Sequence, residues 1–71
     1  MSNQTNFILN GNKYRTQNEL TILELINYFN YNTSLLVLEY NSSICAKKNW
    51  DKTRIKNNDK IEIVLHFARF G

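Results

Sequence analysis

The last stretch of the chain places the strongest constraint on the fold. Between residues 60 and 67 hydrophobic side chains recur at every second position, at Ile61, Ile63, Leu65 and Phe67. This period of two is typical of a strand with one face buried. Such a strand predicts that residues 68–71 form a flexible tail that leaves the body and ends on the carboxylate of Gly71. Because glycine lacks a Cβ, that end could thread a narrow channel, although many domains end on a flexible residue without further use.

The first half of the chain predicts a hairpin. Strands over residues 6–9 and 13–15 flank Asn10-Gly11. This dipeptide suits the two positive-φ positions of a type I′ turn, which joins antiparallel strands with the correct twist.

One helix follows the hairpin. Thr21 and Glu24 have the spacing of a capping box, so we expect a helix from there to about Asn30. Asn30 and Asn32 are candidates to end it, because asparagine tolerates the left-handed region. A sheet could cover the stripe of apolar residues at i, i+3, i+4 and i+7, which are Ile22, Leu25, Ile26 and Phe29.

The second half predicts further strands. Residues 35–40 are mostly apolar, which favours an interior strand buried on much of both faces. Residues 44–46 could form a short strand, 47–54 an irregular segment with a helical turn near 48–50, and 57–59 a tight turn. The order of elements indicates an α+β fold, a mixed four- to five-stranded sheet around one helix. If the last strand runs parallel to the first, the fold is a β-grasp, the ubiquitin-like roll.

Size and charge narrow the class of protein. Seventy-one residues form a single domain, and the net charge of +3 is carried by separate basic residues. The densest basic stretch could be a weak patch for an acidic protein or nucleic acid, but a solvated face accounts for it better. It comprises Lys47, Lys48, Lys52, Arg54 and Lys56.

The cysteine count and the N-terminal residues bear on the compartment. A single cysteine excludes an internal disulfide, and one Cys with one His cannot complete a tetrahedral zinc site. Residues 1–6 do not resemble a signal peptide, and no apolar run approaches a membrane span. We expect a soluble protein of a reducing compartment. The bias toward Asn, Ile, Lys and Tyr suggests an AT-rich genome, hence a plastid stroma or the cytoplasm of a low-GC bacterium.

The residues that could catalyse a reaction do not form a recognisable set. His66 is expected on the exposed face of the last strand, without a nucleophile at a suitable spacing. Cys45 fits a small buried hydrophobe, and Trp50 fits an anchor at the edge of the core. Asp51, Asp59 and Glu62 are interpreted as turn and surface residues. With glycine only at 11 and 71, the chain has no glycine-rich phosphate loop.

A series of short motifs follows in order along almost the whole chain. They are Leu9-Asn10-Gly11, Thr21-Ile22-Leu23-Glu24-Leu25, Glu39-Tyr40-Asn41, Ile44, Trp50, Asn58-Asp59-Lys60-Ile61-Glu62-Ile63-Val64, His66-Phe67 and a terminal Gly71. Each is moderately specific, but their order and spacing resemble the ThiS family, the sulfur carriers of thiamin thiazole biosynthesis.

The resemblance implies a β-grasp fold and a function located at Gly71. In the family, an ATP-dependent ThiF-like enzyme adenylates the terminal carboxylate, and sulfur then replaces AMP to give a thiocarboxylate. Thiazole synthase, a ThiG-like enzyme, takes that sulfur during ring formation. The carrier is therefore not an enzyme and binds no cofactor of its own. The resemblance implies that Ala68, Arg69 and Phe70 enter a channel of the partner enzyme. As a hypothesis, the partner surface is the exposed sheet face near this tail, with Glu62, His66 and Phe67 on it.

The tail departs from the family pattern, which ends in Gly-Gly. Here Phe70 stands at the penultimate position, Arg69 precedes it, and Leu65 looks inserted between Val64 and His66. The partner enzymes could have wider channels, the tail could have lost carrier activity, or the encoded end could be processed.

Three other functions remain open from the sequence. One is the small subunit of molybdopterin synthase, which shares the fold and tail, although the Asn10-Gly11 hairpin and the last strand favour the thiazole branch. Another is an interaction module that is no longer a carrier, which Arg69 and Phe70 favour. The third is a small RNA-binding domain, and the modest charge disfavours it.

Overall fold

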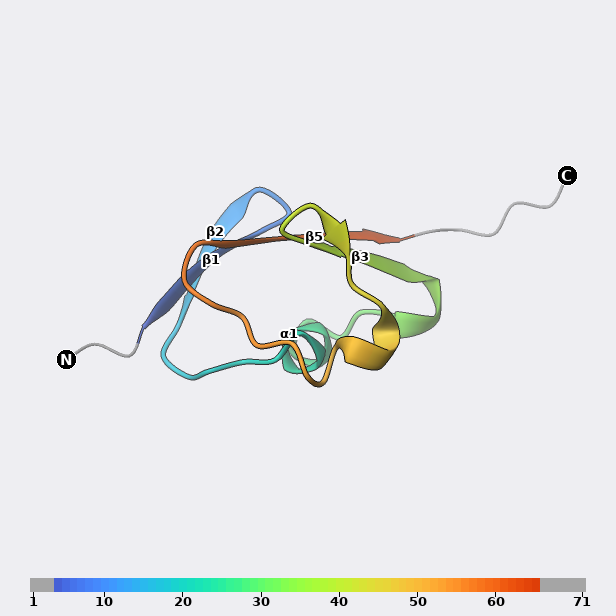
Figure 1. Ribbon diagram of the computed structural model, residues 1–71, viewed down its shortest axis with the longest axis horizontal. Helices are drawn as coiled ribbons and strands as arrows, with labels where there is room; N and C mark the ends of the chain where they lie inside the picture. Colours follow the sequence, from blue (N-terminus) through green and yellow to red (C-terminus); the bar gives the residue numbers. More distant parts are fainter. Residues whose placement is uncertain (1–3, 66–71) are drawn as a thin grey trace, which may run out of the picture.

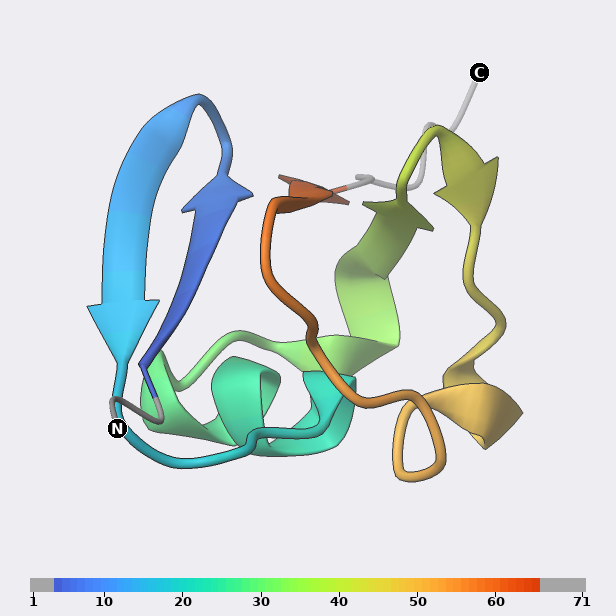
Figure 2. The ribbon, with the colours of Figure 1, turned by 60° about the vertical axis from the view of Figure 1, so that its left-hand side comes forward.

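The computed structural model describes residues 4–65, with Leu65 described by its backbone only. Five strands form one mixed sheet in the order β2-β1-β5-β3-β4 (Figures 1 and 2). The helix α1 (Ile22–Tyr28) lies against one face of this sheet, which confirms the predicted β-grasp. The strands are β1 (Thr5–Leu9), β2 (Asn12–Thr16), β3 (Leu36–Tyr40), β4 (Ser43–Ile44) and β5 (Asp59–Leu65).

The pairing of β5 decides the topology. It lies in the middle of the sheet, parallel to β1 and antiparallel to β3. In the parallel pair Phe7 lies opposite Asp59, and Leu9 lies opposite Ile61. The parallel pairing that the order of elements suggested is therefore confirmed.

The hairpin turn has the predicted geometry. Asn10 and Gly11 have φ values of 51° and 83°, the two left-handed positions that a type I′ turn requires. The register of β1 and β2 follows from this turn, with Leu9 opposite Asn12 and Phe7 opposite Tyr14.

The capping box that was expected before α1 is also present. The Glu24 amide donates to Thr21 Oγ1 at 3.1 Å, and the Thr21 amide donates to Glu24 Oε1 at 2.8 Å. The helix ends at Tyr28, two residues earlier than expected, and Asn30 takes the left-handed conformation at φ 59°.

The expectation for Asn32 was wrong. Its φ is −78°, and its side chain accepts from the Ser34 amide at the start of the short 3-10 helix η1 (Thr33–Leu35). The chain has already left α1 at Asn30, so Asn32 begins a new element.

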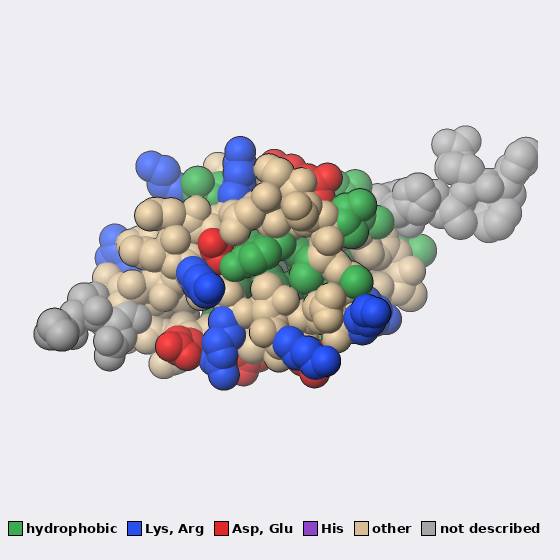
Figure 3. Space-filling model, viewed as in Figure 1, with side chains coloured by type: hydrophobic (Ala, Val, Ile, Leu, Met, Phe, Trp, Pro, Cys, Tyr) green, Lys and Arg blue, Asp and Glu red, His purple; other side chains and the backbone are tan. Residues whose placement is uncertain are grey.

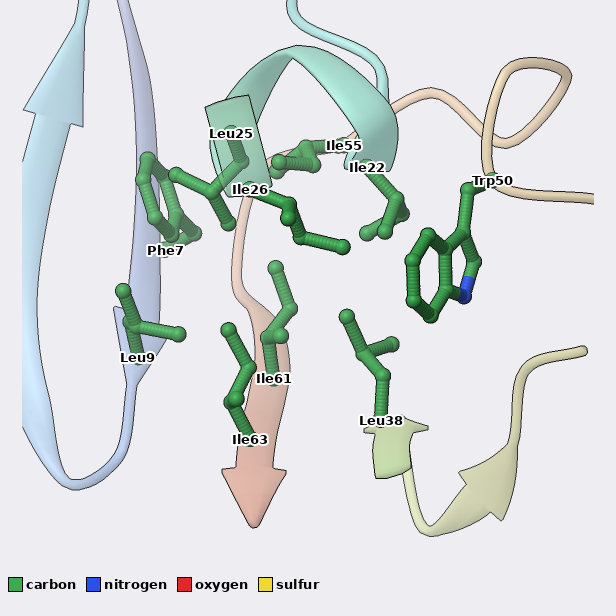
Figure 4. Packing of buried hydrophobic residues seen from close by; sticks show 10 residues of the cluster. All are labelled: Phe7, Leu9, Ile22, Leu25, Ile26, Leu38, Trp50, Ile55, Ile61 and Ile63. Atoms are coloured by element: carbon green, nitrogen blue, oxygen red, sulfur yellow. The ribbon is translucent and has the colours of Figure 1, made fainter. Parts of the chain in front are cut away.

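The core lies between α1 and the sheet and contains ten buried apolar residues (Figure 4). The helix contributes three of the four predicted stripe positions, while Phe29 is only partly buried against the cluster. Sheet, helix and closing loop together supply Phe7, Leu9, Ile22, Leu25, Ile26, Leu38, Trp50, Ile55, Ile61 and Ile63.

Trp50 closes one side of this core, as its predicted role as an anchor requires. It is 2% exposed, and its indole Nε1 donates to the Cys45 carbonyl at 3.0 Å. It follows the 3-10 helix η2 (Lys47–Asn49), which agrees with the expected helical turn. Cys45 is only partly buried.

Two predictions for the β3–β4 region were wrong. β3 is not buried on both faces, because Val37 is 37% exposed. The single helix covers one face of the sheet, so an apolar sequence alone does not ensure burial on the other. The short strand is Ser43–Ile44 rather than 44–46, and Ile44 is 73% exposed.

Candidate functional site

Strand β5 connects the core to residues 66–71, and its first residue is fixed in place by hydrogen bonds. Asp59 is 7% exposed, so its interpretation as a surface residue was wrong. Its carboxylate accepts from the Tyr40 hydroxyl, from Asn41 Nδ2 at 3.1 Å and from the Lys56 amide at 2.7 Å. A buried carboxylate requires such partners, and here they tie the start of β5 to the end of β3.

The tyrosine in this cluster has a perturbed titration. Partial burial, the hydrogen bond to Asp59 and the negative charge of that carboxylate, in that order, raise the pKa of Tyr40 to about 12. The phenol therefore stays protonated, and able to donate to Asp59, well above neutral pH.

Asparagine side chains hold the backbone of β5 from both sides. Asn10 Oδ1 accepts from the Ile63 amide at 2.7 Å, and Asn41 Oδ1 accepts from the Lys60 amide at 2.8 Å. Both asparagines have positive φ, in the turns after β1 and β3. The asparagine bias of the sequence, first interpreted as a sign of ancestry, thus has a structural use here.

The opposite end of β5 presents an exposed surface, on the sheet face away from α1. Val64 is 55% exposed and lies opposite Val37 on β3. Glu62 lies opposite Glu39, which in turn lies opposite Ile44 of β4. In Figure 3 hydrophobic side chains reach the surface near the end of β5, and acidic ones lie close by. We call Val37, Glu39, Ile44, Glu62 and Val64 the exit surface.

The charges of the exit surface are not compensated within it. Glu39 and Glu62 face each other across β3 and β5, and like charges directly opposite repel. Among residues 4–65, the one ion pair joins Arg54 to Glu19 at 3.0 Å, with both side chains well exposed. A partner with apolar and basic side chains would complement this surface.

The sequence-predicted site residues fall largely outside the described part of the chain. Glu62 is exposed, as predicted. His66, Phe67 and the tail of Ala68, Arg69, Phe70 and Gly71 lie outside residues 4–65. The valines of the exit surface were missed, although the alternation that places Ile61 and Ile63 inside already places Val64 outside.

Other candidate chemistry is not assembled by the fold. Cys45 Sγ has Thr53 Oγ1 at 3.8 Å, and within residues 4–65 no three His, Cys, Asp or Glu side chains are grouped to hold a metal ion. The basic side chains at 47, 48, 52, 54 and 56 are exposed, and Lys and Arg are scattered among neutral side chains in Figure 3. Within the described range, no helix has both the length and the apolarity to span a bilayer.

Comparison with known proteins agrees with this architecture. The family model described as "ThiS family" matches residues 7–68. A crystal structure of a thiamine biosynthesis protein (ThiS) from Geobacter metallireducens superposes with a TM-score of 0.80 at 23% identity, covering 94% of this chain and all of that one. At that identity the superposition establishes the shared fold.

Two curated relatives carry the name "uncharacterized protein ycf40". The protein of Trieres chinensis is 56% identical over 64 residues, which cover 90% of this chain and 88% of the relative. The protein of Porphyra purpurea is 29% identical over 56 residues, 79% of each chain. Given the family match across residues 7–68, this chain belongs to the ThiS family of sulfur carriers.

Proposed function

We propose that this protein carries sulfur on the carboxyl group of Gly71 and donates it for thiazole formation in thiamin biosynthesis. The observation that carries the proposal is the ThiS-family match over residues 7–68. The order of elements adds support, since β5 ends at Leu65 and few residues separate it from Gly71.

The proposed chemistry needs an activated carboxyl group. A carboxylate is a poor electrophile, so a ThiF-like enzyme first joins it to the α-phosphate of ATP, releasing pyrophosphate and forming a mixed anhydride. A donor system then supplies sulfur at the oxidation level of sulfide, which attacks the carbonyl carbon and expels AMP. The resulting thiocarboxylate passes its sulfur to a thiazole synthase of the ThiG type.

In this scheme the carrier is a protein substrate, and the nucleotide site belongs to the partner. The carrier supplies a body to be recognised and an end to be modified. No bound cofactor of its own is needed, and ATP is consumed by the activating enzyme.

The exit surface is the proposed docking site for these partners. It combines exposed valines with two facing carboxylates, and part of it is formed by β5 itself, the strand that leads toward the tail. Burying apolar area contributes about 25 cal/mol per Å², and a basic partner side chain would relieve the repulsion between Glu39 and Glu62. We propose that His66 and Phe67 extend this surface and that residues 68–71 enter the active channel.

Phe70 is the feature that favours a second candidate, an interaction module that has lost carrier activity. A benzyl group beside the reacting carboxylate would clash with a channel shaped for bare backbone. Carrier activity therefore requires a partner with a wider channel. A carrier for molybdopterin synthesis would share the chemistry up to the thiocarboxylate and differ in the enzyme that accepts the sulfur.

We place the carrier in a plastid stroma or a bacterial cytoplasm, which the amino-acid bias toward AT-rich codons supports. The organisms of the two ycf40 relatives, Trieres chinensis and Porphyra purpurea, are sources from which candidate partner enzymes could be taken.

An assay of ATP–pyrophosphate exchange tests the proposal at its first step. An activating enzyme from the same source is incubated with the full chain, with a variant lacking Gly71, and with Phe70→Gly. Carrier function predicts exchange that depends on Gly71. Exchange by Phe70→Gly alone would identify the tail as the obstacle and favour the interaction module.

A further inference from the structure

The free edge of the sheet at β2 is the strongest feature that the carrier scheme does not use. Among residues 4–65, β2 pairs only with β1 and lies at the end of the strand order (Figure 2). An unpaired edge presents backbone N–H and C=O groups that a further strand can bind.

The register of the hairpin identifies those groups. Across a two-residue turn the pair next to the turn exchanges hydrogen bonds, and such pairs then alternate with non-bonded ones. Asn6 confirms the phase, because its amide donates to Asn57 Oδ1 and its carbonyl accepts from the Asn58 amide, away from β2. The backbone groups of Lys13 and Arg15 therefore point to the free edge.

An apolar hollow borders this edge on the helix side. It has a volume of about 450 Å³ and lies between β2 and α1. Its lining is mostly apolar, with Tyr14, Tyr28 and Phe29, but it also includes the charged side chains of Arg15 and Glu24. The Tyr14 ring meets the Phe29 ring edge-on at 5.6 Å, and Tyr28 meets Phe29 at 5.1 Å. Tyr28 is 80% exposed, so an aromatic surface is open to a partner.

The other side of β2 is basic. A second hollow has a volume of about 590 Å³, and no carboxylate lines it. Its lining consists of two cations, two asparagines and three apolar or aromatic residues, which are Lys13, Arg15, Asn6, Asn58, Phe7, Ile8 and Tyr14. Arg15 Nε donates to Asn6 Oδ1 at 3.3 Å, which orients the guanidinium group over the sheet. Tyr14 and Arg15 border both hollows, but the side toward α1 has more aromatic rings and the other side has both cations, Lys13 and Arg15.

We propose that the β2 edge binds an extended segment of a partner protein in which acidic side chains alternate with apolar ones. Successive side chains of a strand point to opposite faces. When such a segment pairs with β2, its apolar side chains enter the aromatic hollow and its carboxylates meet Lys13 and Arg15. Backbone hydrogen bonds supply affinity, and the alternation supplies specificity.

A second copy of this chain does not fit the same edge. Two β2 strands paired antiparallel about a two-fold axis at Tyr14 would place Lys13 of one copy opposite Arg15 of the other. Directly opposed cations are destabilising. The charge pattern therefore disfavours self-pairing and selects an acidic strand.

This edge is separate from the proposed docking site. The exit surface spans β3, β4 and the end of β5, whereas β1 lies between β2 and β5. An acidic strand can therefore occupy β2 while an enzyme holds the exit surface. The inference does not depend on the sulfur chemistry.

Peptide titration followed by NMR tests the proposal. The probe is a seven-residue peptide that alternates valine with glutamate, and the control alternates valine with lysine. We expect the glutamate peptide to slow amide hydrogen exchange at Lys13 and Arg15 and to shift the ring signals of Tyr14 and Tyr28. Equal binding of both peptides, changes confined to β3 and β4, or concentration-dependent protection without peptide would overturn it.

Charge reversal supplies the matched variants. Arg15→Glu and Lys13→Glu should each weaken the glutamate peptide by about threefold to tenfold, and the double variant should prefer the lysine peptide. Lys48→Glu changes the same charge in η2 and should leave affinity unchanged. Tyr28→Ser, at an exposed position, should weaken both peptides. Unchanged preference in the double variant would contradict the proposed contacts.

Discussion

The two ends of β5 differ in burial and in hydrogen bonding. At its start Asp59 is buried and bonded to Tyr40, Asn41 and the Lys56 amide. Near its end Val64 is 55% exposed and lies opposite the exposed Val37. The strand is thus fixed where it begins and exposed where it leads to the tail. Substitutions at the start should therefore affect folding, whereas substitutions at the end should affect partners.

The largest effect is expected at Asp59. Replacement by Ala removes the acceptor of the Lys56 amide and of the Asn41 side-chain amide, and it leaves the Tyr40 hydroxyl with the Arg54 carbonyl at 3.2 Å. It should lower the free energy of unfolding by about 3 kcal/mol. Urea denaturation followed by Trp50 fluorescence measures this. Asp51→Ala, at an exposed turn, is the control and should change stability by less than about 0.5 kcal/mol. Equal effects at both positions would contradict the proposed anchoring.

A smaller effect is expected at Asn10. Asn10→Ala removes the acceptor of the Ile63 amide and places a Cβ-bearing residue without a polar side chain at φ 51°. The combined loss should be about 2 kcal/mol. Asn10→Gly restores the backbone freedom but not the hydrogen bond, so it should lose about 1 kcal/mol. A glycine variant as unstable as the alanine variant would assign the whole effect to the side chain.

Alkaline pH should weaken the start of β5 through Tyr40. Because folding raises the pKa of Tyr40 from 10.0 to about 12, its contribution is complete below pH 10 and is lost as pH rises through 12. Solvent screening at this partly exposed phenol limits the loss to about 1 kcal/mol. Urea denaturation at pH 9 and at pH 11.5 should show this loss of unfolding free energy. In Tyr40→Phe the loss between the two pH values should be smaller by the contribution of Tyr40. The same pH dependence in both proteins would exclude Tyr40 as its source.

The smallest effect on stability is expected at the exit surface. Val64→Ser and Glu62→Lys should each change the free energy of unfolding by less than about 0.5 kcal/mol, yet slow adenylation by the activating enzyme severalfold. Asp51→Lys is the charge-matched control and should be adenylated normally. Normal adenylation of both exit-surface variants would move the docking site elsewhere.

Local patterns made most of the fold predictable. Three patterns each predict a local geometry from residues that are close in sequence. They are the Asn10-Gly11 turn, the capping box of Thr21 and Glu24, and the alternation of Ile61 and Ile63. The burial of Asp59 was missed because its partner Tyr40 lies 19 residues away in sequence and meets it only across the sheet. The exposure of Val37 was missed because an apolar strand does not reveal which of its faces the single helix covers.

The candidate site was less predictable than the fold. Family resemblance pointed to Gly71, while the exit surface emerged only once β3, β4 and β5 lay side by side. Glu62 was expected to be exposed, but its position opposite Glu39 depends on the register of two distant segments.

The mass of the intact protein after sulfur loading tests the central claim most directly. The full chain is incubated with the activating enzyme, ATP and a sulfur donor, and then compared with a Gly-Gly-ended ThiS protein treated in parallel. The account predicts the gain of one oxygen-for-sulfur exchange, mapped to Gly71. An unchanged mass beside a fully charged control would contradict it and leave a carrier fold without carrier chemistry.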